Sequence, residues 1–548
     1  MASAEQAVTP VGSKLGPSVG EASQKNSCTR FNAFWVGLLG APCQFTRFVA
    51  RLYQTFGAYV PTVVLQYGMN QGIGMSYGNM ARRVYFADVL HLDGALSTRY
   101  FAAAMLPWSV KPIFGILSDA MPICGYHRSP YLVIAGASGL IAWTALGTLP
   151  LTGMATVPFF LLVNISVCMP DVMVDGSTAE LTKDKPVHAS NLQSLSWGAL
   201  GIGGLVTCST SGFMVDTFGP RIVFLFANVF SLGVLVPGLL NWLGDQKESK
   251  DAEGLGTQWL RKNAVVSLLA AYMSTSALTL SVLQIFVESK AVRGSVTVAI
   301  AAILVIGVFA VLKPVSSILA KTASFIFVRE CFQLGGGEVM FQWLKNYEGG
   351  PQFTATVLSW IDCFGSVGLL AGITIYNKFL SEVPYRKIFL LAQMAMLFPC
   401  LFDLVLVKRW NLALGIPDIV MLIGDDAFTV TMRRFFSMPM FILAAKVCPD
   451  AIEATLFAML MALSNFGSTV AEFIGTSLFE AFGVVGGNFD RLPDVIISKA
   501  LLRIVPMFII PSLVPSLRPS DPIPLGSDSD GCKATKDAPV PAEAAVAA

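Results

Sequence analysis

The sequence predicts an all-α membrane protein, built from two pseudo-symmetric six-helix bundles with an extra helix pair between them. Apolar residues make up 54% of the 548 residues and charged residues only 13%, about half the charged share of a soluble domain. Apolar runs of roughly 20 residues, the length that crosses the hydrocarbon core of a bilayer, recur along the chain. A single soluble core cannot bury so much apolar surface.

Fourteen apolar runs, separated by polar breaks, are the candidate membrane spans. Their approximate bounds are 57–80, 95–117, 131–151, 156–179, 190–214, 221–243, 264–287, 296–312, 314–336, 353–375, 386–407, 418–446, 454–481 and 498–516. The first run is crowded with Gly, Asn and Gln, and the seventh is rich in Ser and Thr, so these two are the weakest candidates.

The chain repeats itself at an offset near 260 residues. Residues 190–219 match 454–483, an offset of 264 (454 minus 190), and residues 119–128 match 377–386, an offset of 258 (377 minus 119). Two nearly equal offsets in the same order indicate parallel halves of six helices. This is the layout of the major facilitator fold, which places its solute site between the halves. The offset leaves 264–312 as a two-helix insert.

We therefore expect five regions along the chain. They are a cytosolic N-terminal tail (1–50), an N-terminal six-helix bundle (51–243), a central linker with the two-helix insert (244–313), a C-terminal six-helix bundle (314–516) and a disordered cytosolic tail (517–548). The excess of Lys and Arg in short loops places the N-terminus inside, although Arg82 and Arg83 then fall in a loop on the opposite side. We expect a multi-pass protein of the plasma membrane, with an organelle membrane as the alternative.

The composition argues against several other classes of site. The net charge is +2, which gives no basic surface for nucleic acid. The ten cysteines have neither zinc-site nor CxxC spacing, so we expect them to be packing residues. The three histidines lack the HExxH spacing of a metal site. We expect no metal, no cofactor and no nucleic-acid partner.

A candidate gating latch lies between the second and third runs. Glycines and prolines force a tight turn there, and Asp119 and Arg128 offer opposite charges. Asp119 could also accept backbone N–H groups at a neighbouring helix N-terminus. With Glu180 and Arg386, these residues could hold the cytosolic side closed. A solvated turn with an ordinary surface pair is the alternative.

The fourth run carries two carboxylates, Asp171 and Asp175, which are four residues apart on one helix face. An acid inside the hydrocarbon is costly unless it faces a cavity or a partner, which makes it a functional candidate. Two carboxylates on one face repel each other when both are ionised, and this suits proton uptake near neutral pH. The alternative is that the helix ends early and leaves Asp175 in water.

Lys111 lies inside the second run, before the helix-kinking Pro112 and one turn from Trp108. A cation beside an indole face could bind an anionic solute, or it could simply pair with Asp171 or Asp175.

Later runs supply the remaining candidates for substrate binding or proton coupling. Asp425 and Arg433 share one long run, and Glu472 is a lone acid within another. Gln193 and Trp197 are four apart on the fifth run and could line a cavity, although such a pair more often serves helix packing.

Ordered motifs in both halves carry a family resemblance. They are Pro107-Trp108, Lys111-Pro112, Ser118-Asp119, Gly125-Tyr126, Arg128, Asp171, Val174-Asp175-Gly176, Ala179-Glu180, Leu192-Gln193-Ser194-Leu195-Ser196-Trp197, Gly203-Gly204, Leu414-Gly415-Ile416-Pro417-Asp418, Gly424-Asp425, Met438-Pro439, Cys448-Pro449 and Glu453-Ala454-Thr455-Leu456-Phe457-Ala458. On these residues the chain resembles the folate–biopterin transporter family of the major facilitator superfamily, over about 95–245 and 314–510. His127 departs from the family pattern, because a second Arg is common there.

The resemblance implies a secondary active transporter for folate, biopterin or a related pteridine, commonly a proton symporter that works by alternating access. Some members look specialised for other solutes, so S-adenosylmethionine is the alternative substrate. A pterin presents two adjacent N–H donors that a carboxylate such as Asp171 or Asp175 can accept. Its ring could stack on Trp108 or Trp197, and a cation could bind a folate's carboxylate tail.

Two rival classes differ from a carrier. Gly424-Asp425 resembles the GxGD motif of intramembrane aspartic proteases, but Leu422 replaces the first glycine and no Tyr-Asp partner precedes it. A channel or a non-transporting sensor on the same scaffold is the other rival. We expect a carrier that is not an enzyme, with a small-molecule substrate, protons and the lipid bilayer as its partners.

Overall fold

The computed structural model describes residues 46–182, 186–247, 264–447 and 453–521. The chain divides into two compact units, 1–60 and 61–548, with the boundary inside α2 (Tyr59–Val63). Residues 46–56 of the first unit form a helix. Most of the two predicted tails, 1–50 and 517–548, lies outside the described residues.

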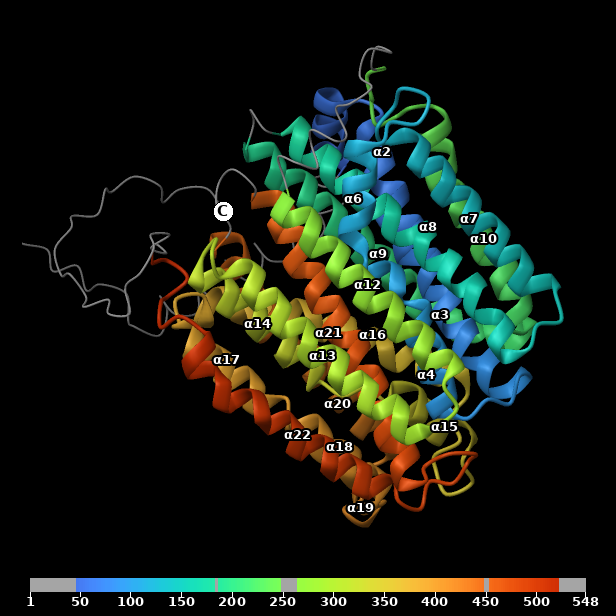
Figure 1. Ribbon diagram of the computed structural model, residues 1–548. Helices are drawn as coiled ribbons and strands as arrows, with labels where there is room; N and C mark the ends of the chain where they lie inside the picture. Colours follow the sequence, from blue (N-terminus) through green and yellow to red (C-terminus); the bar gives the residue numbers. More distant parts are fainter. Residues whose placement is uncertain (1–45, 183–185, 248–263, 448–452, 522–548) are drawn as a thin grey trace, which may run out of the picture. The chain divides into compact units, whose positions relative to one another are not determined.

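The described part of the second unit is built from helices (Figure 1). A first bundle contains η1 (Val64–Gly74), α3 (Met75–Val84), η2 (Tyr85–Val89), α4 (Gly94–Ala104), α5 (Leu106–Ser109), α6 (Lys111–Ala120), α7 (Ser129–Thr148), α8 (Gly153–Leu181), α9 (Pro186–Phe218) and α10 (Pro220–Leu239). The inserted pair is α12 (Ala264–Phe286) and α13 (Lys290–Leu312). A second bundle contains α14 (Ser317–Cys331), α15 (Gly337–Asn346), α16 (Ala355–Ile375), η4 (Tyr376–Leu380), α17 (Tyr385–Ala395), α18 (Phe398–Val407), α19 (Trp410–Ala413), α20 (Asp418–Val447), α21 (Glu453–Phe482) and α22 (Leu492–Leu513).

Ten of the described helices are long and apolar enough to cross a membrane. They correspond to ten of the fourteen predicted runs, and both helices of the insert are among them. The other four runs became the broken segments from η1 to η2, from α4 to α6 and from α14 to α15, together with the charged helix α20. Prolines at the first turns of α5 and α6 account for one of these breaks.

The first crossing is longer than the apolar run predicted. Helical structure continues through α3 and η2 to Val89, so the prediction that Arg82 and Arg83 lie in a loop is wrong. Arg82 is only 2% exposed. The apolar pattern predicts the end of the run at this arginine pair. It does so because the local sequence contains no information about an opposite charge from a distant part of the chain.

The two repeated segments fold alike, as α9 and α21. These are the two long helices of 33 and 30 residues, and each ends at a glycine with positive φ: Gly219 at 79° and Gly483 at 75°. Glycine adopts this left-handed conformation without steric cost, which suits a helix C-terminus. Both helices contact the opposite bundle, α9 through α16 and α21 through α4, α5 and α6.

A disulfide between Cys208 of α9 and Cys363 of α16 crosses the bundle interface, with 5.3 Å between the Cα atoms. The prediction that all the cysteines are packing residues is therefore wrong for this pair. Near it, the hydroxyls of Ser211 and Ser359 lie 2.8 Å apart. The fifth and tenth predicted runs thus form one covalently joined contact between the bundles.

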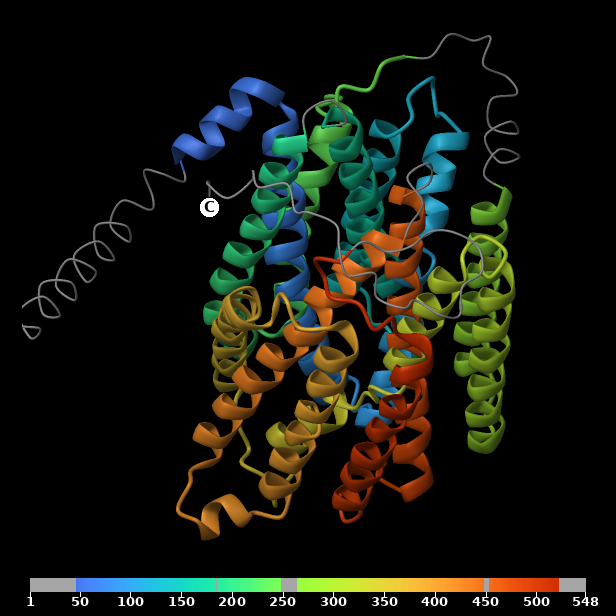
Figure 2. The same ribbon diagram turned by 90° about the vertical axis from the view of Figure 1, so that its left-hand side faces the viewer.

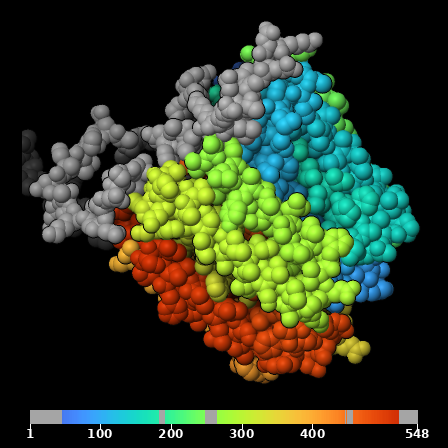
Figure 3. Space-filling model, viewed as in Figure 1, coloured from blue at the N-terminus to red at the C-terminus, as the bar shows by residue number. Residues whose placement is uncertain are grey.

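The inserted pair lies against both bundles. Helix α12 contacts α4, α5 and α6 of the first bundle, α13 contacts α14 of the second, and both contact α21. Figure 3 shows the light green pair across the boundary between the blue and teal helices and the red ones, and Figure 2 shows it at the edge of the helices. Its outer side exposes Leu268, Ile303 and Ile306, as expected of a surface that faces lipid.

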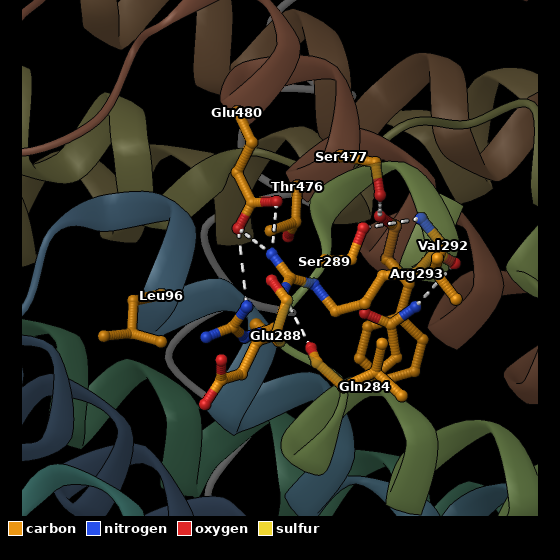
Figure 4. Close-up of polar contacts among 12 residues, drawn as sticks. Leu96, Gln284, Glu288, Ser289, Val292, Arg293, Thr476, Ser477 and Glu480 are labelled. Carbon is orange, nitrogen blue, oxygen red and sulfur yellow. Dashed lines mark hydrogen bonds and ion pairs between the residues drawn. The ribbon is translucent and has the colours of Figure 1, made fainter. Parts of the chain in front are cut away.

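Arg293, just after the turn between α12 and α13, binds Glu480 of α21 (Figure 4). Its Nη2 donates to both carboxylate oxygens at 2.7 and 2.6 Å, while Nη1 donates to the carbonyl oxygens of Val287 and Glu288. Arg99 of α4 reaches the same carboxylate at 3.4 Å. We call Arg99, Arg293 and Glu480 the interface triad, because they join the first bundle, the insert and the second bundle.

The triad should contribute strongly to the stability of the fold. Arg293→Gln should destabilise the protein by about 3–5 kcal/mol, because it removes the bidentate partner of a buried carboxylate. The double variant with Glu480→Gln should recover most of that loss. Thermal unfolding in detergent measures both effects. The control is Arg491→Gln, whose ion pair with Asp494 is largely exposed and worth at most about 1 kcal/mol. Equal losses for Arg293→Gln and Arg491→Gln would contradict the prediction.

The disulfide predicts a specific change in thiol labelling. Denatured protein treated with a polyethylene-glycol maleimide should gain two labels after reduction by a dithiol, because Cys208 and Cys363 become free. The Cys208→Ser/Cys363→Ser variant should show the same number of labels with and without reduction. A gel shift reads the count, and an unchanged count in the wild type would show that the bond does not form.

Candidate functional site

A cavity of about 720 Å³ lies between the two bundles, within the usual range of about 300–1,000 Å³ for small-molecule sites. The described lining comes from α3, α4, α5 and α9 on one side and from α15, α16 and α21 on the other. Its five ionisable side chains are Arg82, Arg83, Glu338, Asp362 and Glu472. Both arginines belong to the first bundle and all three acids to the second, so the two walls carry opposite charge.

Three of the four runs that lack a long apolar helix supply this lining, through α3, α4–α5 and α15. Their polar side chains lower the apolarity, and their breaks expose backbone groups. Non-helical backbone at membrane depth is tolerated only inside protein or beside a wet cavity. The polar side chains and helix breaks that weaken the apolar signal of these runs are thus the same features that allow them to line a wet cavity.

Arg82 and Arg83 meet Glu338 across the bundle interface. Arg82 donates from Nη2 to Glu338 Oε1 at 2.9 Å, and Arg83 donates from Nε to the same oxygen at 3.4 Å. The Arg82 guanidinium also stacks 3.5 Å from the ring centre of Phe101. The Arg82 side chain is 2% exposed, whereas that of Arg83 is 33% exposed. One carboxylate thus faces two guanidinium groups, and Arg83 keeps unused donors at the cavity.

Asp362 and Glu472 differ from Glu338. Among the described residues, no lysine or arginine nitrogen forms an ion pair within 4.0 Å of either carboxylate. The cation with the largest effect on Glu472 is Lys499 of α22, which forms no ion pair with it within 4.0 Å. The acidic wall therefore holds two carboxylates without a direct ion pair.

The structure brings two of the predicted site residues, Trp108 and Glu472, into the lining of this cavity. The Trp108 indole donates from Nε1 to Asn164 Oδ1 at 3.0 Å, which fixes the orientation of the ring. The two residues come from opposite bundles, so a solute in the cavity could touch both.

Lys111, Asp171 and Asp175 form a second polar cluster next to Trp108. Lys111 pairs with Asp171, the internal ion pair that was one of the two predicted alternatives. Asp175 accepts a hydrogen bond from the Tyr67 hydroxyl at 2.6 Å. Lys111 Nζ is 5.7 Å from the centre of the Trp108 ring. The cluster adjoins the cavity through Trp108 without lining it.

Four other predicted site residues are not in the cavity lining. Asp425 accepts a hydrogen bond from its own helix, from Thr429 Oγ1 at 3.4 Å. Arg433 and Gln193 are exposed, and the Trp197 ring is 60% exposed. The structure therefore does not gather these four with Trp108 and Glu472.

The structure brings together some, but not all, of the predicted latch residues. Arg128 binds both Glu180 oxygens, at 2.7 and 2.6 Å, and lies 3.9 Å from Asp119. The residue that accepts N–H groups at the start of α7 is Asp245, from Arg128 and Ser129 at 2.8 and 2.6 Å, so the prediction of this role for Asp119 is wrong. Arg386 lies in the second bundle and donates to the Val514 carbonyl.

Four charged residues of the cavity were missed by sequence reasoning: Arg82, Arg83, Glu338 and Asp362. Asp362 is a lone acid within an apolar run, the same signal that selected Glu472, and it could have been found. The other three lie just beyond the predicted ends of their runs. No local signal places them in a cavity.

Comparison with known proteins matches residues 71–534 to the BT1 family. The chain is 30% identical to "Probable folate-biopterin transporter 6" of Arabidopsis thaliana, over 85% of this chain and 86% of that protein. It is 27% identical to the "Folate-biopterin transporter" of Synechocystis sp., over 80% and 78% of the two chains. It is also 21% identical to "Folate transporter 1" of Plasmodium falciparum, over 77% and 73%.

Solved structures of other transporters share the fold. The nucleoside transporter NupG aligns with a TM-score of 0.57 and 13% identity, over 84% of this chain and 100% of that one. A POT family transporter in complex with 5-aminolevulinic acid aligns with a TM-score of 0.60 and 15% identity, over 83% and 96%. The predicted major facilitator fold is thereby confirmed, and with the family match it makes the chain a multi-pass membrane transporter. The chain belongs to the BT1 family.

Proposed function

We propose that the protein carries a folate, a biopterin or a related pteridine across its membrane by proton-coupled alternating access. The names of its relatives support the substrate class. The observation that carries the proposal is the cavity between the bundles, where Arg83 on one wall faces Asp362 and Glu472 on the other.

The chemistry of a folate complements these two walls. The pterin edge presents two adjacent N–H donors, which a carboxylate such as Asp362 accepts as a bidentate pair. The flat ring can stack on Trp108, and a carboxylate of the glutamate tail matches the planar fork of Arg83. The same solute thus contacts both bundles. Such contact with both is required if binding is to control their relative movement.

Proton coupling follows from the charges of the cavity. Its five ionisable side chains carry two positive and three negative charges when all are ionised, a net charge of −1 (2 minus 3). A folate adds further negative charge, so its binding favours protonation of a cavity carboxylate. By reciprocity, a bound proton favours binding of the folate to the same extent. The cluster of Lys111, Asp171 and Asp175 is the second candidate site for the proton.

Alternating access is supported by the uneven distribution of contacts. The ion pair of Arg82 with Glu338 and the interface triad join the bundles. At the latch end, Arg128 pairs with Glu180 within the first bundle, and Arg386 donates to the Val514 carbonyl within the second. This arrangement fits a carrier closed on one side and open on the latch side, the cytosol if the N-terminus is inside. Rocking of the bundles would exchange the two states.

S-adenosylmethionine is the alternative substrate, because Asp362 and Glu472 could pair with its positive charges. A thermal-shift screen of the purified protein with folates, pterins, S-adenosylmethionine and nucleosides separates the candidates. A ligand at a hundred times its Kd stabilises the folded state by about 2.7 kcal/mol. We expect the largest shift with a folate or a pterin, and a shift with S-adenosylmethionine alone would contradict the proposal.

Arg83 should discriminate between folate and biopterin. Arg83→Gln should lower the uptake of radiolabelled folate by proteoliposomes about tenfold, because one charge-assisted hydrogen bond is worth roughly 1.5–3 kcal/mol. Biopterin lacks the glutamate tail, so its uptake should change less than twofold. Arg491→Gln, on the exposed surface, is the matched control. Equal losses for the two substrates would remove Arg83 from tail binding.

The cluster next to Trp108 can be tested in the same vesicles. Asp175→Asn and Lys111→Ala should each slow folate uptake driven by an acid-outside pH gradient. Lys111→Ala should have the larger effect, because it leaves the buried Asp171 carboxylate without its cation. Rates equal to the wild type in both variants would show that the cluster takes no part in transport.

A further inference from the structure

The first crossing of the second bundle is broken beside the cavity. Helix α14 ends at Cys331, and α15 begins at Gly337. Three consecutive glycines, Gly335, Gly336 and Gly337, close this break. Gly336 has a φ of 131°, a conformation that only glycine adopts readily. Gly337 and Glu338 line the cavity, so the break opens onto the candidate site.

Glu472 of α21 occupies the space that these glycines leave. A Cβ atom added to Gly335 would overlap the carboxylate carbon and both carboxylate oxygens of Glu472. The N–H of Gly335 donates to the Ala471 carbonyl at 3.4 Å, which joins the break to α21. Because the Glu472 carboxylate fills the space beside Gly335, any larger residue at position 335 would displace it.

The acids nearest the cavity fall into two kinds. Glu338 and Glu480 have arginine partners within 3 Å, so protonation would sacrifice a strong ion pair. Glu472 has no ion pair within 4.0 Å among the described residues. The charged groups that face it are Lys499 of α22, Glu338 of α15 and Arg433 of α20. Asp362 also lacks a direct ion pair, but it is exposed and lies within the unbroken helix α16. Glu472 is thus an acid without a direct ion pair at a place where the backbone is interrupted and its geometry can change.

We infer that Gly335 is a positioning residue that seats Glu472 at the cavity wall, where Glu472 carries the coupling proton. This inference rests on the proposed proton-coupled transport and assigns the proton to one carboxylate. Rocking of the bundles moves α21 against the α4–α6 region that it contacts. The same movement changes the surroundings of Glu472 at the break, which links its protonation to the side that is open.

The test compares Gly335 with a glycine outside the cavity lining. Gly335→Ala should lower the accumulation of radiolabelled folate driven by a pH gradient by about tenfold, since a displacement of about 1 Å at a reacting group has effects of this size or larger. Counterflow of labelled against unlabelled folate at equal pH should stay within about twofold of the wild type. Gly201→Ala, in α9, is the control, because a Cβ there meets nothing within 4 Å and the residue is not part of the cavity lining. It should retain both activities.

A rescue separates positioning from a general structural role. In Gly335→Ala/Glu472→Asp the acid is one methylene shorter, which makes room for the new Cβ. Gradient-driven accumulation should return to within about threefold of the Glu472→Asp carrier. If Gly335→Ala fails to fold while the double variant folds and accumulates folate, the inference is also supported. If neither Gly335→Ala nor the double variant folds while Glu472→Asp is active, the contact between Gly335 and Glu472 has only a structural role and the inference is overturned.

The remaining outcomes distinguish this inference from the proposed function. If Gly335→Ala behaves like Gly201→Ala, Gly335 is not a positioning residue. If Glu472→Gln still accumulates folate against its gradient, another group carries the proton. Both results leave transport itself intact. Only a wild-type carrier that shows counterflow but no response to the pH gradient would overturn proton coupling as a whole.

Discussion

The need to neutralise charge at membrane depth governs this structure. An ionised side chain in hydrocarbon is costly unless a partner or a wet cavity receives it. Arg82 meets this requirement through Glu338, and Arg293 through Glu480. Both pairs join segments that belong to different parts of the fold. The charges that appear unfavourable in the sequence are therefore the ones that bring the bundles and the insert together.

The two-helix insert neutralises a buried carboxylate of the second bundle. Arg293 binds Glu480 through both carboxylate oxygens, whereas Arg99 makes one longer contact with it. If the bundles separate at this end, Arg99 can leave while Glu480 keeps a counter-charge. A bare buried carboxylate would otherwise oppose the separation. The extra helix pair thus supplies Glu480 with a counter-charge that does not depend on Arg99.

The site combines charged side chains that have an ion-pair partner with charged side chains that have none within 4.0 Å in the described part of the chain. Glu338 is held by two arginines, while Asp362 and Glu472 have no close cation in the described part of the chain. Matched pairs hold the bundles in place, and unmatched groups remain available for a solute or a proton. The break between α14 and α15 leaves the space that the Glu472 carboxylate occupies. Broken helices at the repeat interface also form the solute sites of other transporter folds.

The sequence by itself determined the all-helical membrane fold and the repeat, and it singled out Trp108 and Glu472, which line the cavity, because apolar length and lone polar residues are local signals. Tertiary structure decided which charges meet. Arg82 and Glu338 are 256 residues apart, Arg293 and Glu480 are 187 apart, and Lys111 and Asp171 are 60 apart. It also decided that Gln193 and Trp197 lie outside the cavity. A single sequence records each charge but not its neighbour on another helix, and that neighbour determines whether the charge stabilises the fold or stays free for function.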